Sequence, residues 1–235
     1  MSVEGLVLSR TSVALQLWET NDTVISGNNI TASKEDGIDL ASSFNDSISG
    51  NNITANRFRG IYLDSSSSNT ILGNNITNNA IGIWLVSSSN NLICHNNFVN
   101  STDGDHVIDF ASSSANTWDD GYLSGGNYWS DYNGTDVHRG AYQNETGSDG
   151  VGDTPYTIDP NNEDHYPLMT PWHQIPGDIN FDGKVSLQDL IILTKAYGSK
   201  PGDANWNPVA DILGHGKVDL ADIVTLANHY GQHYP

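Results

Sequence analysis

Oxygen-bearing side chains recur through a twelve-residue stretch near the C-terminus, from Asp178 to Asp189. Positions 1, 3, 5 and 12 carry carboxylates or an amide, and position 6 is the glycine that a sharp turn requires. The carbonyl of position 7 and, through a water molecule, the side chain of position 9 complete the donor set. Hard oxygen ligands at this spacing match the calcium-loop template and predict a Ca²⁺ site. The candidate ligands are Asp178, Asn180, Asp182, Lys184, Ser186 and Asp189.

A second copy of this stretch begins 33 residues later, at Asp211. It keeps Asp219 at position 9 and Asp222 at position 12, but position 3 is Leu213 and position 5 is His215. Because a hard cation loses two oxygen ligands, we expect the second site to be weak or empty. The remaining candidate ligands are Asp211, Lys217, Asp219 and Asp222.

Apolar residues at helical spacing follow each loop and predict helices at about 187–197 and 220–230. Two calcium loops, each followed by one helix and closed by aspartate, resemble a type I dockerin over residues 178–231. The resemblance implies a Ca²⁺-binding domain at 174–235 that docks a cohesin module. It also implies that positions 10 and 11 of each repeat choose the partner, here Leu187, Gln188, Leu220 and Ala221. Since the two pairs differ, we expect one binding orientation to be preferred; an intramolecular or self-association element is the alternative.

The elements that precede these loops begin with a repeat. One sequence occurs four times, as DTVISGNNITAS (22–33), DSISGNNITAN (46–56), NTILGNNITNN (69–79) and NLICHNNFVN (91–100). The shared isoleucines, at 25, 48, 71 and 93, are 23, 23 and 22 residues apart. Such a period without a helical pattern is typical of stacked coils, in which each unit buries its apolar face on its neighbours. We predict a mainly β fold, a parallel β-helix with three short strands per coil, over residues 1–117.

Paired asparagines recur in these copies, at 28/29, 51/52, 74/75 and 96/97. Asparagine tolerates left-handed backbone at a sharp corner, and its amide can bond to the identical amide one coil away. We therefore expect a structural ladder. Three of these asparagines also head glycosylation triplets and are expected to be buried: Asn29, Asn52 and Asn75.

Between the copies, GIDL (37–40), GIYL (60–63) and GIWL (82–85) alternate apolar and variable residues, so the variable residue should face outward. The expected outward column is Gln16, Asp39, Tyr62, Trp84 and Asp109, with Ile108 and Phe110 inward. Asp39 and Asp109 would lie about 14 Å apart, too far for a glycosidase carboxylate pair. The column also lacks a basic residue, since Arg57 and Arg59 lie nearby but are expected at a coil corner. We therefore expect no enzyme. Tyr62 and Trp84 are a candidate platform for a sugar ring, or an exposed pair that packs on a neighbour.

Two weaker patterns offer metal ligands. Asp149 and Asp153 flank glycines and could share a Ca²⁺ with backbone carbonyls, although a plain turn explains them equally. Cys94, the single cysteine, is expected to look outward beside His95. This pair suggests copper, but two ligands on one coil make a weak site.

The repeat resembles the right-handed β-helix repeat family, whose relatives include polysaccharide lyases and the periplasmic copper-site maturation protein of nitrous oxide reductase. This resemblance implies the fold and its right-handed, 22–23-residue coils, and says little of function. The next segment, 118–173, holds three of the six tryptophans and is expected to cap the last coil. Its GGNYWSDYNGTD (125–136) resembles the tail of archaeal surface β-helix proteins.

The chain carries 9 basic and 28 acidic residues, a formal net charge of −19. This balance argues against nucleic acid and anionic membranes as partners and favours cations. No apolar run approaches the length of a membrane span, so membrane insertion is not expected. Glycosylation triplets begin at Asn21, Asn45, Asn100, Asn133 and Asn144, as expected of a secreted chain whose signal is removed or lies upstream.

These features predict a secreted, non-catalytic extracellular or cell-surface protein that is attached to a partner through its calcium-binding domain. Two other functions fit the same sequence. The chain could form a filament or surface layer, in which copies join head to tail. It could also be a dockerin-borne protein that binds or degrades polysaccharide.

Overall fold

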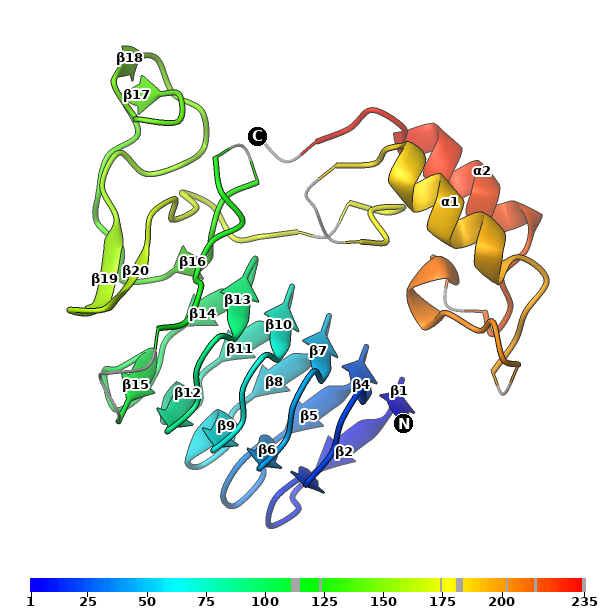
Figure 1. Ribbon diagram of the computed structural model, residues 1–235, viewed down its shortest axis with the longest axis horizontal. Coiled ribbons are helices and arrows are strands. Elements are labelled where there is room, and N and C mark those ends of the chain that lie inside the picture. The colour runs from blue at the N-terminus through cyan, green and yellow to red at the C-terminus, as the bar shows by residue number, and fades with distance from the viewer. Residues whose placement is uncertain are drawn as a thin grey trace. The chain divides into compact units, whose positions relative to one another are not determined.

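Each copy of the repeat folds into one coil with three short strands, and the strands of successive coils pair in parallel (Figure 1). The chain divides into two compact units, Met1–Trp172 and His173–Pro235. The prediction of a mainly β, parallel β-helix is confirmed in the first unit. This computed structural model describes residues 1–110, 115–122, 124–173, 175–180, 184–201, 203–213 and 215–233.

Three parallel sheets form the walls of the β-helix. The first contains, in order, β1 (Ser2–Glu4), β4 (Val24–Ser26), β7 (Ser47–Ser49), β10 (Thr70–Leu72) and β13 (Leu92–Cys94). The second contains β16 (Tyr128–Trp129), β14 (Asn97–Val99), β11 (Asn75–Thr77), β8 (Asn52–Thr54), β5 (Asn29–Thr31) and β2 (Val7–Ser9). The third contains β15 (Val107–Asp109), β12 (Ile81–Val86), β9 (Arg59–Asp64), β6 (Ile38–Ala41) and β3 (Leu15–Trp18).

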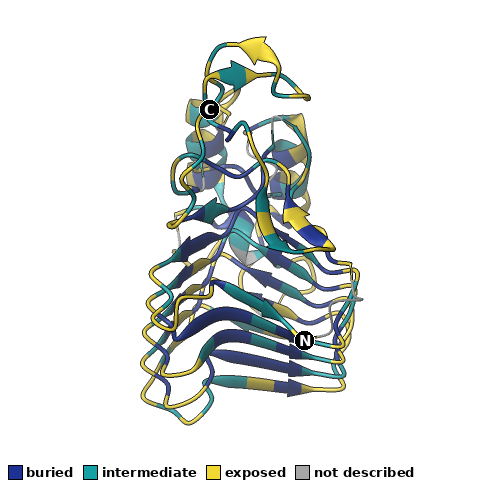
Figure 2. Cartoon of the chain, turned by 90° about the vertical axis from the view of Figure 1, so that its left-hand side faces the viewer, coloured by how far each residue is buried: buried dark blue, intermediate teal, exposed yellow. Residues whose placement is uncertain are grey.

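The core consists of apolar columns that run through successive coils. In the first sheet Ile25 pairs with Ile48, Ile48 with Ile71, and Ile71 with Ile93, and all four are 0% exposed. Figure 2 shows the buried positions running along the stacked strands. Complete burial of each such side chain contributes about 2 kcal/mol, so a short coil becomes stable only by stacking on its neighbours.

The last coil departs by one residue from the predicted register. Trp84 pairs with Ile108, and Leu85 pairs with Asp109, so Asp109 continues an inward column. The prediction that Ile108 and Phe110 face inward around Asp109 is therefore wrong, and Phe110 is 73% exposed. The partner of Ile83 is Val107 instead of the predicted Ile108, and a shift of one residue moves every side chain of the strand to the opposite face.

The first asparagine of each pair forms the expected ladder. Each side-chain Nδ2 donates to the Oδ1 one coil further on, at 2.9 to 3.0 Å, from Asn28 through Asn51, Asn74 and Asn96 to Asn127. The second asparagines of the first three pairs are exposed, so the prediction of their burial is wrong: Asn29, Asn52 and Asn75.

The left-handed residue at this corner is the one that precedes the pair, rather than an asparagine of the pair. It is Gly27, Gly50 or Gly73, with φ of 62°, 60° and 64°, and His95 with φ of 57° in the fourth coil. Glycine adopts this conformation without a steric penalty, whereas His95 takes it at a cost that the surrounding contacts offset.

The glycines of the GIDL, GIYL and GIWL segments are required by close approach of neighbouring coils. A Cβ on Gly60 would lie 2.7 Å from the carbonyl oxygen of Gly82, and a Cβ on Gly82 would lie 2.4 Å from that of His106. Because backbone atoms cannot move aside easily, these positions exclude any side chain.

The segment after the repeat covers the core of the last coil. β16 adds to β14, and the Trp129 ring stacks between Phe98 and Tyr156 with centroid distances of 4.4 and 4.2 Å. Trp129 Nε1 donates to Asp164 Oδ2 at 2.8 Å. Burial raises the pKa of Asp164 to about 7, although this and other hydrogen bonds favour the ionised form. Two short hairpins complete the segment: β17 (His138–Arg139) with β18 (Glu145–Thr146), and β19 (Tyr156–Asp159) with β20 (Asn162–Asp164).

The second unit contains α1 (Leu187–Ala196), the short 3₁₀ helix η1 (Pro208–Ala210) and α2 (Leu220–His229). The predicted helices thus exist and end one residue early. Both begin with a capping box, Ser186 with Asp189 and Asp219 with Asp222. A small core holds the unit together, made of Ile179, Val185, Leu193, Ala196, Ala210, Val218 and Leu226. In the described part of the chain, no helix has the length and apolar character needed to cross a bilayer.

Candidate functional site

The first calcium loop contributes two fully buried carboxylates beside the start of α1. Asp178 and Asp189 are both 0% exposed. Asp189 Oδ1 accepts the amide hydrogens of Ile179 and Asn180, at 2.8 and 3.2 Å, and its Oδ2 accepts that of Ser186 at 2.8 Å. A single carboxylate therefore links the beginning of the loop to the first turn of the helix.

The donor set of the first loop fits Ca²⁺. Burying two carboxylates in one loop is costly unless a cation or several donors compensate them, and Ca²⁺ prefers carboxylate, amide and carbonyl oxygens. The residues that would hold the ion are Asp178, Asn180, Lys184 through its carbonyl, Ser186 and Asp189. The sixth predicted ligand, Asp182, lies outside the described residues.

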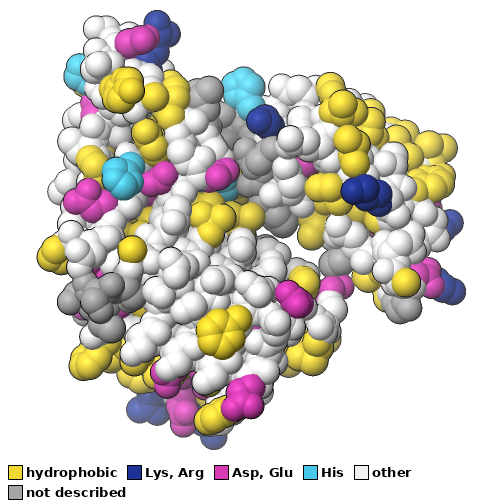
Figure 3. All heavy atoms as spheres, in the orientation of Figure 1, with side chains coloured by type: hydrophobic (Ala, Val, Ile, Leu, Met, Phe, Trp, Pro, Cys, Tyr) yellow, Lys and Arg dark blue, Asp and Glu magenta, His cyan; other side chains and the backbone are white. Residues whose placement is uncertain are grey.

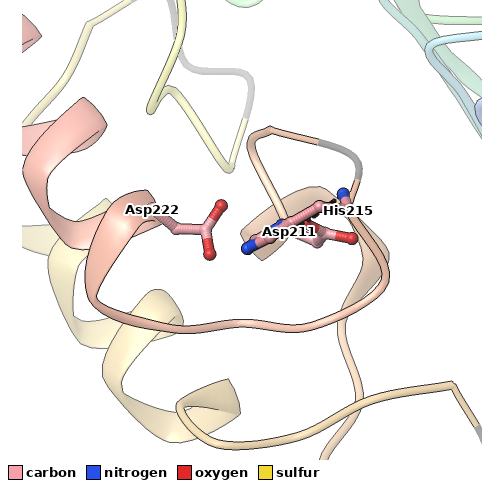
Figure 4. Close-up of side chains that lie close together, drawn as sticks. All are labelled: Asp211, His215 and Asp222. Carbon is pink, nitrogen blue, oxygen red and sulfur yellow. Dashed lines mark hydrogen bonds and ion pairs between the residues drawn. The ribbon is translucent and has the colours of Figure 1, made fainter.

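In the second loop, the imidazole of His215 lies against the carboxylate of Asp211 (Figure 4). His215 Nδ1 is 2.7 Å from Asp211 Oδ1, and Nε2 is 3.5 Å from Asp219 Oδ1. The hydrogen bond to Asp211 raises the pKa of His215. Leu213, at position 3, is 53% exposed and its side chain offers no donor atom. The second loop therefore presents an imidazole where the first loop is predicted to present oxygen.

A potential metal-binding cluster is present at this place. Asp211, His215 and Asp222 bring one ligand atom each within 4.8 Å of one another. Over the described ranges, this is the one group of three or more histidine, cysteine, aspartate or glutamate side chains close enough to hold an ion. His215 is not among the ligands predicted from the sequence, although its spacing of four residues from Asp211 could have indicated a metal site.

Both helices of the second unit expose apolar side chains. Leu187 and Ile191 on α1 are 58% and 45% exposed, and the equivalent Leu220 and Val224 on α2 are 62% and 50% exposed. Figure 3 shows hydrophobic side chains gathered over these helices. The four residues predicted to choose a partner are all exposed: Leu187, Gln188, Leu220 and Ala221. Ile191 and Val224 extend this surface by one turn, and their spacing of four residues from the leucines is the signal in the sequence.

The third sheet carries a charged and aromatic cluster on its outer side. Tyr62 pairs with Trp84, as expected of the outward column. Arg59 donates to both oxygens of Asp36, at 2.8 and 2.7 Å, and its guanidinium lies 3.6 Å from the centroid of the Tyr62 ring. Arg59 is not a member of the predicted column, but its guanidinium lies against the ring of Tyr62, which is. Arg59 begins β9 instead of turning away at a coil corner, and it covers one face of the Tyr62 ring.

Two polar atoms beside this cluster have no hydrogen-bond partner among the described residues. They are Asp39 Oδ1 and Trp84 Nε1, both shielded from solvent. The other oxygen of Asp39 accepts from Gln16 Nε2 at 3.0 Å, and burial raises the pKa of Asp39. Buried polar atoms without partners are rare in folded proteins.

The candidate extra calcium ligands serve two separate sets of hydrogen bonds. Asp149 accepts from the amide of Gly140 and the side chain of Gln143, at 3.2 and 3.1 Å. Asp153 accepts from the amides of Val137 and His138, at 3.1 and 2.9 Å. Each carboxylate therefore fixes neighbouring loop backbone, and neither belongs to the metal-binding cluster described above.

The Cys94–His95 pair is buried, although Cys94 is in register with Leu72, the position that the sequence predicts to face outward. Cys94 is 1% exposed, and burial raises the pKa of its thiol. His95 Nε2 is 2.9 Å from the carbonyl oxygen of Ser124, and its ring stacks on Trp172 with a centroid distance of 4.0 Å. A protonated thiol is a poor ligand, so these residues do not fit copper.

Two known protein families match the chain, one in each of its two compact units. The family described as "Periplasmic copper-binding protein (NosD)" matches residues 1–134, and "Dockerin type I domain" matches residues 176–229. No curated protein sequence matches the chain. One similar solved structure is the periplasmic alginate epimerase AlgG, with 22% identity and a TM-score of 0.41 over 47% of this chain. The aligned part is 28% of the epimerase chain. Because the first match spans more than half of the sequence, the chain belongs to the NosD family of periplasmic copper-binding proteins.

Proposed function

We propose that this is a secreted, non-catalytic protein whose C-terminal unit binds Ca²⁺ and attaches the β-helix to a partner protein. The observation that carries the proposal is the pair of exposed leucines, Leu187 and Leu220, at the first position of two equivalent helices that each follow a loop of the calcium type. Exposed apolar side chains at matching positions mark an interaction surface more often than isolated ones do.

Calcium would control this surface through the capping box of α1. Asp189 is both a predicted ligand and the residue that receives the amide hydrogens of Ile179 and Ser186. A bound ion would fix the loop and, with it, the first helical turn that carries Leu187 and Gln188. Removal of Ca²⁺ would loosen both together, because a site of this type gains its order from the ion.

The partner class is inferred from the dockerin match, since type I dockerins typically bind cohesin modules. The two halves of the surface are not equivalent: Leu187 is followed by Gln188, and Leu220 is followed by Ala221. Only the first loop has the complete oxygen pattern. We therefore expect the α1 end to contribute more to binding than the α2 end.

Binding of the full chain to a panel of type I cohesin modules tests the proposal, with biolayer interferometry in Ca²⁺ and in excess chelator. Leu187→Asp should weaken binding by about 100-fold, as expected for a central apolar contact, and Leu220→Asp should weaken it less. Val137→Asp is the matched control, since Val137 is 57% exposed in the first unit. Chelator should abolish binding.

Failure of every module to bind would remove the cohesin partner from the proposal. If the same chain formed Ca²⁺-dependent filaments in electron micrographs, self-assembly would replace attachment as the function. Equal losses with Leu187→Asp and Val137→Asp would show that charge alone, rather than the helix surface, affects binding.

Secretion is supported by both matching families and by the surface of the β-helix. The first match is to a family described as periplasmic. The asparagines of the five triplets expected to carry glycans are all exposed: Asn21, Asn45, Asn100, Asn133 and Asn144. Copper binding is not part of this proposal, because Cys94 and His95 are buried and engaged elsewhere.

Polysaccharide binding on the third sheet is a second candidate function. It is favoured by the neighbouring aromatic side chains of Tyr62 and Trp84 in the outward column, since flat rings can stack on a sugar. The guanidinium of Arg59, 3.6 Å from the centroid of the Tyr62 ring, adds a positive charge beside them.

Affinity electrophoresis in gels that contain neutral or acidic polysaccharides tests this second function. Trp84→Ala should abolish retardation by the polysaccharide that slows the wild-type chain, because it removes one of the two rings on which a sugar would stack. Trp18→Ala is the control, since Trp18 is 68% exposed on β3 of the same sheet. Unchanged retardation of Trp84→Ala would exclude this face as the binding site.

A further inference from the structure

We propose that the second loop binds a divalent transition metal ion, with Zn²⁺ as its representative, through Asp211, His215 and Asp222. This inference is independent of the attachment function proposed above. It would give the two loops of the same unit different metals, Ca²⁺ in the first and a Zn²⁺-like ion in the second.

The second loop does not fit Ca²⁺. Calcium takes six to eight oxygen ligands in flexible geometry. At position 3 the chain offers the side chain of Leu213, and at position 5 it offers the imidazole of His215. His215 Nδ1 is 2.7 Å from Asp211 Oδ1, so the imidazole already engages one of the carboxylate oxygens that a calcium ion would need.

The same three side chains fit a smaller and softer ion. Zn²⁺ accepts imidazole nitrogen and carboxylate oxygen and needs four ligands in a tetrahedron. At bond lengths of about 2.0 to 2.1 Å, tetrahedral ligand atoms lie about 3.3 Å apart. The three ligand atoms here lie within 4.8 Å of one another, so small side-chain rotations would close them around an ion. Asp219, whose Oδ1 is 3.5 Å from His215 Nε2, or a water molecule can complete the set.

Both buried carboxylates are already oriented by backbone amides. Asp211 Oδ2 accepts the amide hydrogen of Gly216 at 2.7 Å, and Asp222 Oδ2 accepts that of Asp219 at 2.8 Å. Asp222 is 0% exposed and Asp211 is 9% exposed, so neither carboxylate is fully hydrated. The opposite oxygens accept further amide hydrogens, Asp211 Oδ1 that of His215 at 3.0 Å and Asp222 Oδ1 that of Leu213 at 3.2 Å. Hydrogen bonds of this kind hold metal ligands in place, and a carboxylate oxygen that accepts one of them keeps a second lone pair for a metal ion.

Figure 4 shows that the Asp222 carboxylate, at the beginning of α2, faces the Asp211–His215 pair. Since Asp222 belongs to the capping box of α2, an ion at this place would fix the first turn of the helix, which carries Leu220. The two helices of the unit would then be ordered by ions of different chemistry.

Isothermal titration of the full chain with Zn²⁺, in saturating Ca²⁺, tests the inference. Calcium fills the first loop, so the titration should show a zinc site that Ca²⁺ does not displace. His215→Asp should weaken this site by about 100-fold or more, since it replaces the imidazole ligand. The same variant should gain a second Ca²⁺ site, because position 5 then carries an oxygen. His173→Asn is the control, since His173 is exposed and lies outside both loops.

Nuclear magnetic resonance of the histidine rings gives a second reading that does not depend on affinity. One equivalent of Zn²⁺ should move the His215 ring signals and leave those of His173 in place. The inference is overturned if zinc affinity is the same in His215→Asp as in the wild type. It is also overturned if Ca²⁺ displaces the bound Zn²⁺, or if neither ion binds and the Asp211–His215 pair alone closes the loop.

Discussion

Replacement of Asn74 by alanine should lower the free energy of unfolding of the Met1–Trp172 unit by about 4 kcal/mol, because it leaves several buried polar groups without partners. The Asn74 side chain is 0% exposed. Its Oδ1 accepts from the backbone amide and the side chain of Asn51, both at 2.9 Å. Its Nδ2 donates to the carbonyl oxygens of Ile48 and Leu72 and to Asn96 Oδ1, at 2.9, 3.2 and 2.9 Å.

The loss should spread beyond the substituted coil. Each rung of the ladder orients the next amide, so the Asn51 side chain would lose one of its two acceptors and keep only the carbonyl oxygen of Ile25. Urea denaturation gives the change in stability, and hydrogen exchange followed by mass spectrometry locates it. We expect faster exchange in residues 48–99 and unchanged exchange in α1 and α2.

The control for this variant is Asn52→Ala. Asn52 follows Asn51 in the same motif, but it is exposed and its side chain donates a single hydrogen bond, to Asn29 at 2.9 Å. This change should cost less than about 0.5 kcal/mol, as is usual for a surface substitution. Equal losses in the two variants would mean that the ladder stabilises the unit no more than its exposed neighbours do.

Trp129→Ala should have a comparable effect, a loss of about 4 kcal/mol, which is typical of deleting a buried tryptophan. Trp129 is 1% exposed and stacks between Phe98 of the last full coil and Tyr156 of the cap. The change also removes the Nε1 donor from the buried carboxylate of Asp164. The open cavity and the loss of one hydrogen-bond donor to this buried carboxylate should together detach the capping segment from the coil beneath it.

The expected signature of this second variant is local. Thermal unfolding should begin earlier, and exchange should accelerate in residues 93–99 and 127–132 before it does so in the first coils. Trp18→Ala is the matched control, since Trp18 is 68% exposed and should be replaced without a measurable change in stability. If exchange accelerates equally in all coils, the cap does not protect the end of the stack as a separate structure.

Much of the fold could be predicted because apolar residues recur at a regular spacing along the sequence. The isoleucines at 25, 48, 71 and 93 recur every 22 or 23 residues, and that period alone defines coils, strand positions and inward columns. The prediction fails where the period ends. Asp109 lies one residue out of register, and a shift of one residue reverses the faces of a strand.

The candidate sites could be predicted to different degrees for a similar reason. The residues of the first calcium loop all lie within twelve positions, so their spacing already defines the chemistry. The cluster of Arg59 with Asp36 and Tyr62 depends on how two coils stack. From the sequence alone, Arg59 is expected at a corner instead. His215 is visible in the sequence as a departure from the calcium pattern, but its position beside Asp211 and Asp222 is not.

The sequence by itself therefore determined the coil architecture, the asparagine ladder and the presence of two loop–helix repeats. These features follow from spacing along the chain, where each residue meets an equivalent residue at a fixed interval. Only the tertiary structure decided which side chains meet across unequal intervals: Trp129 between Phe98 and Tyr156, Asp109 against the cap, and His215 between two buried carboxylates. Such contacts depend on the packing of particular side chains, which no period along the chain specifies.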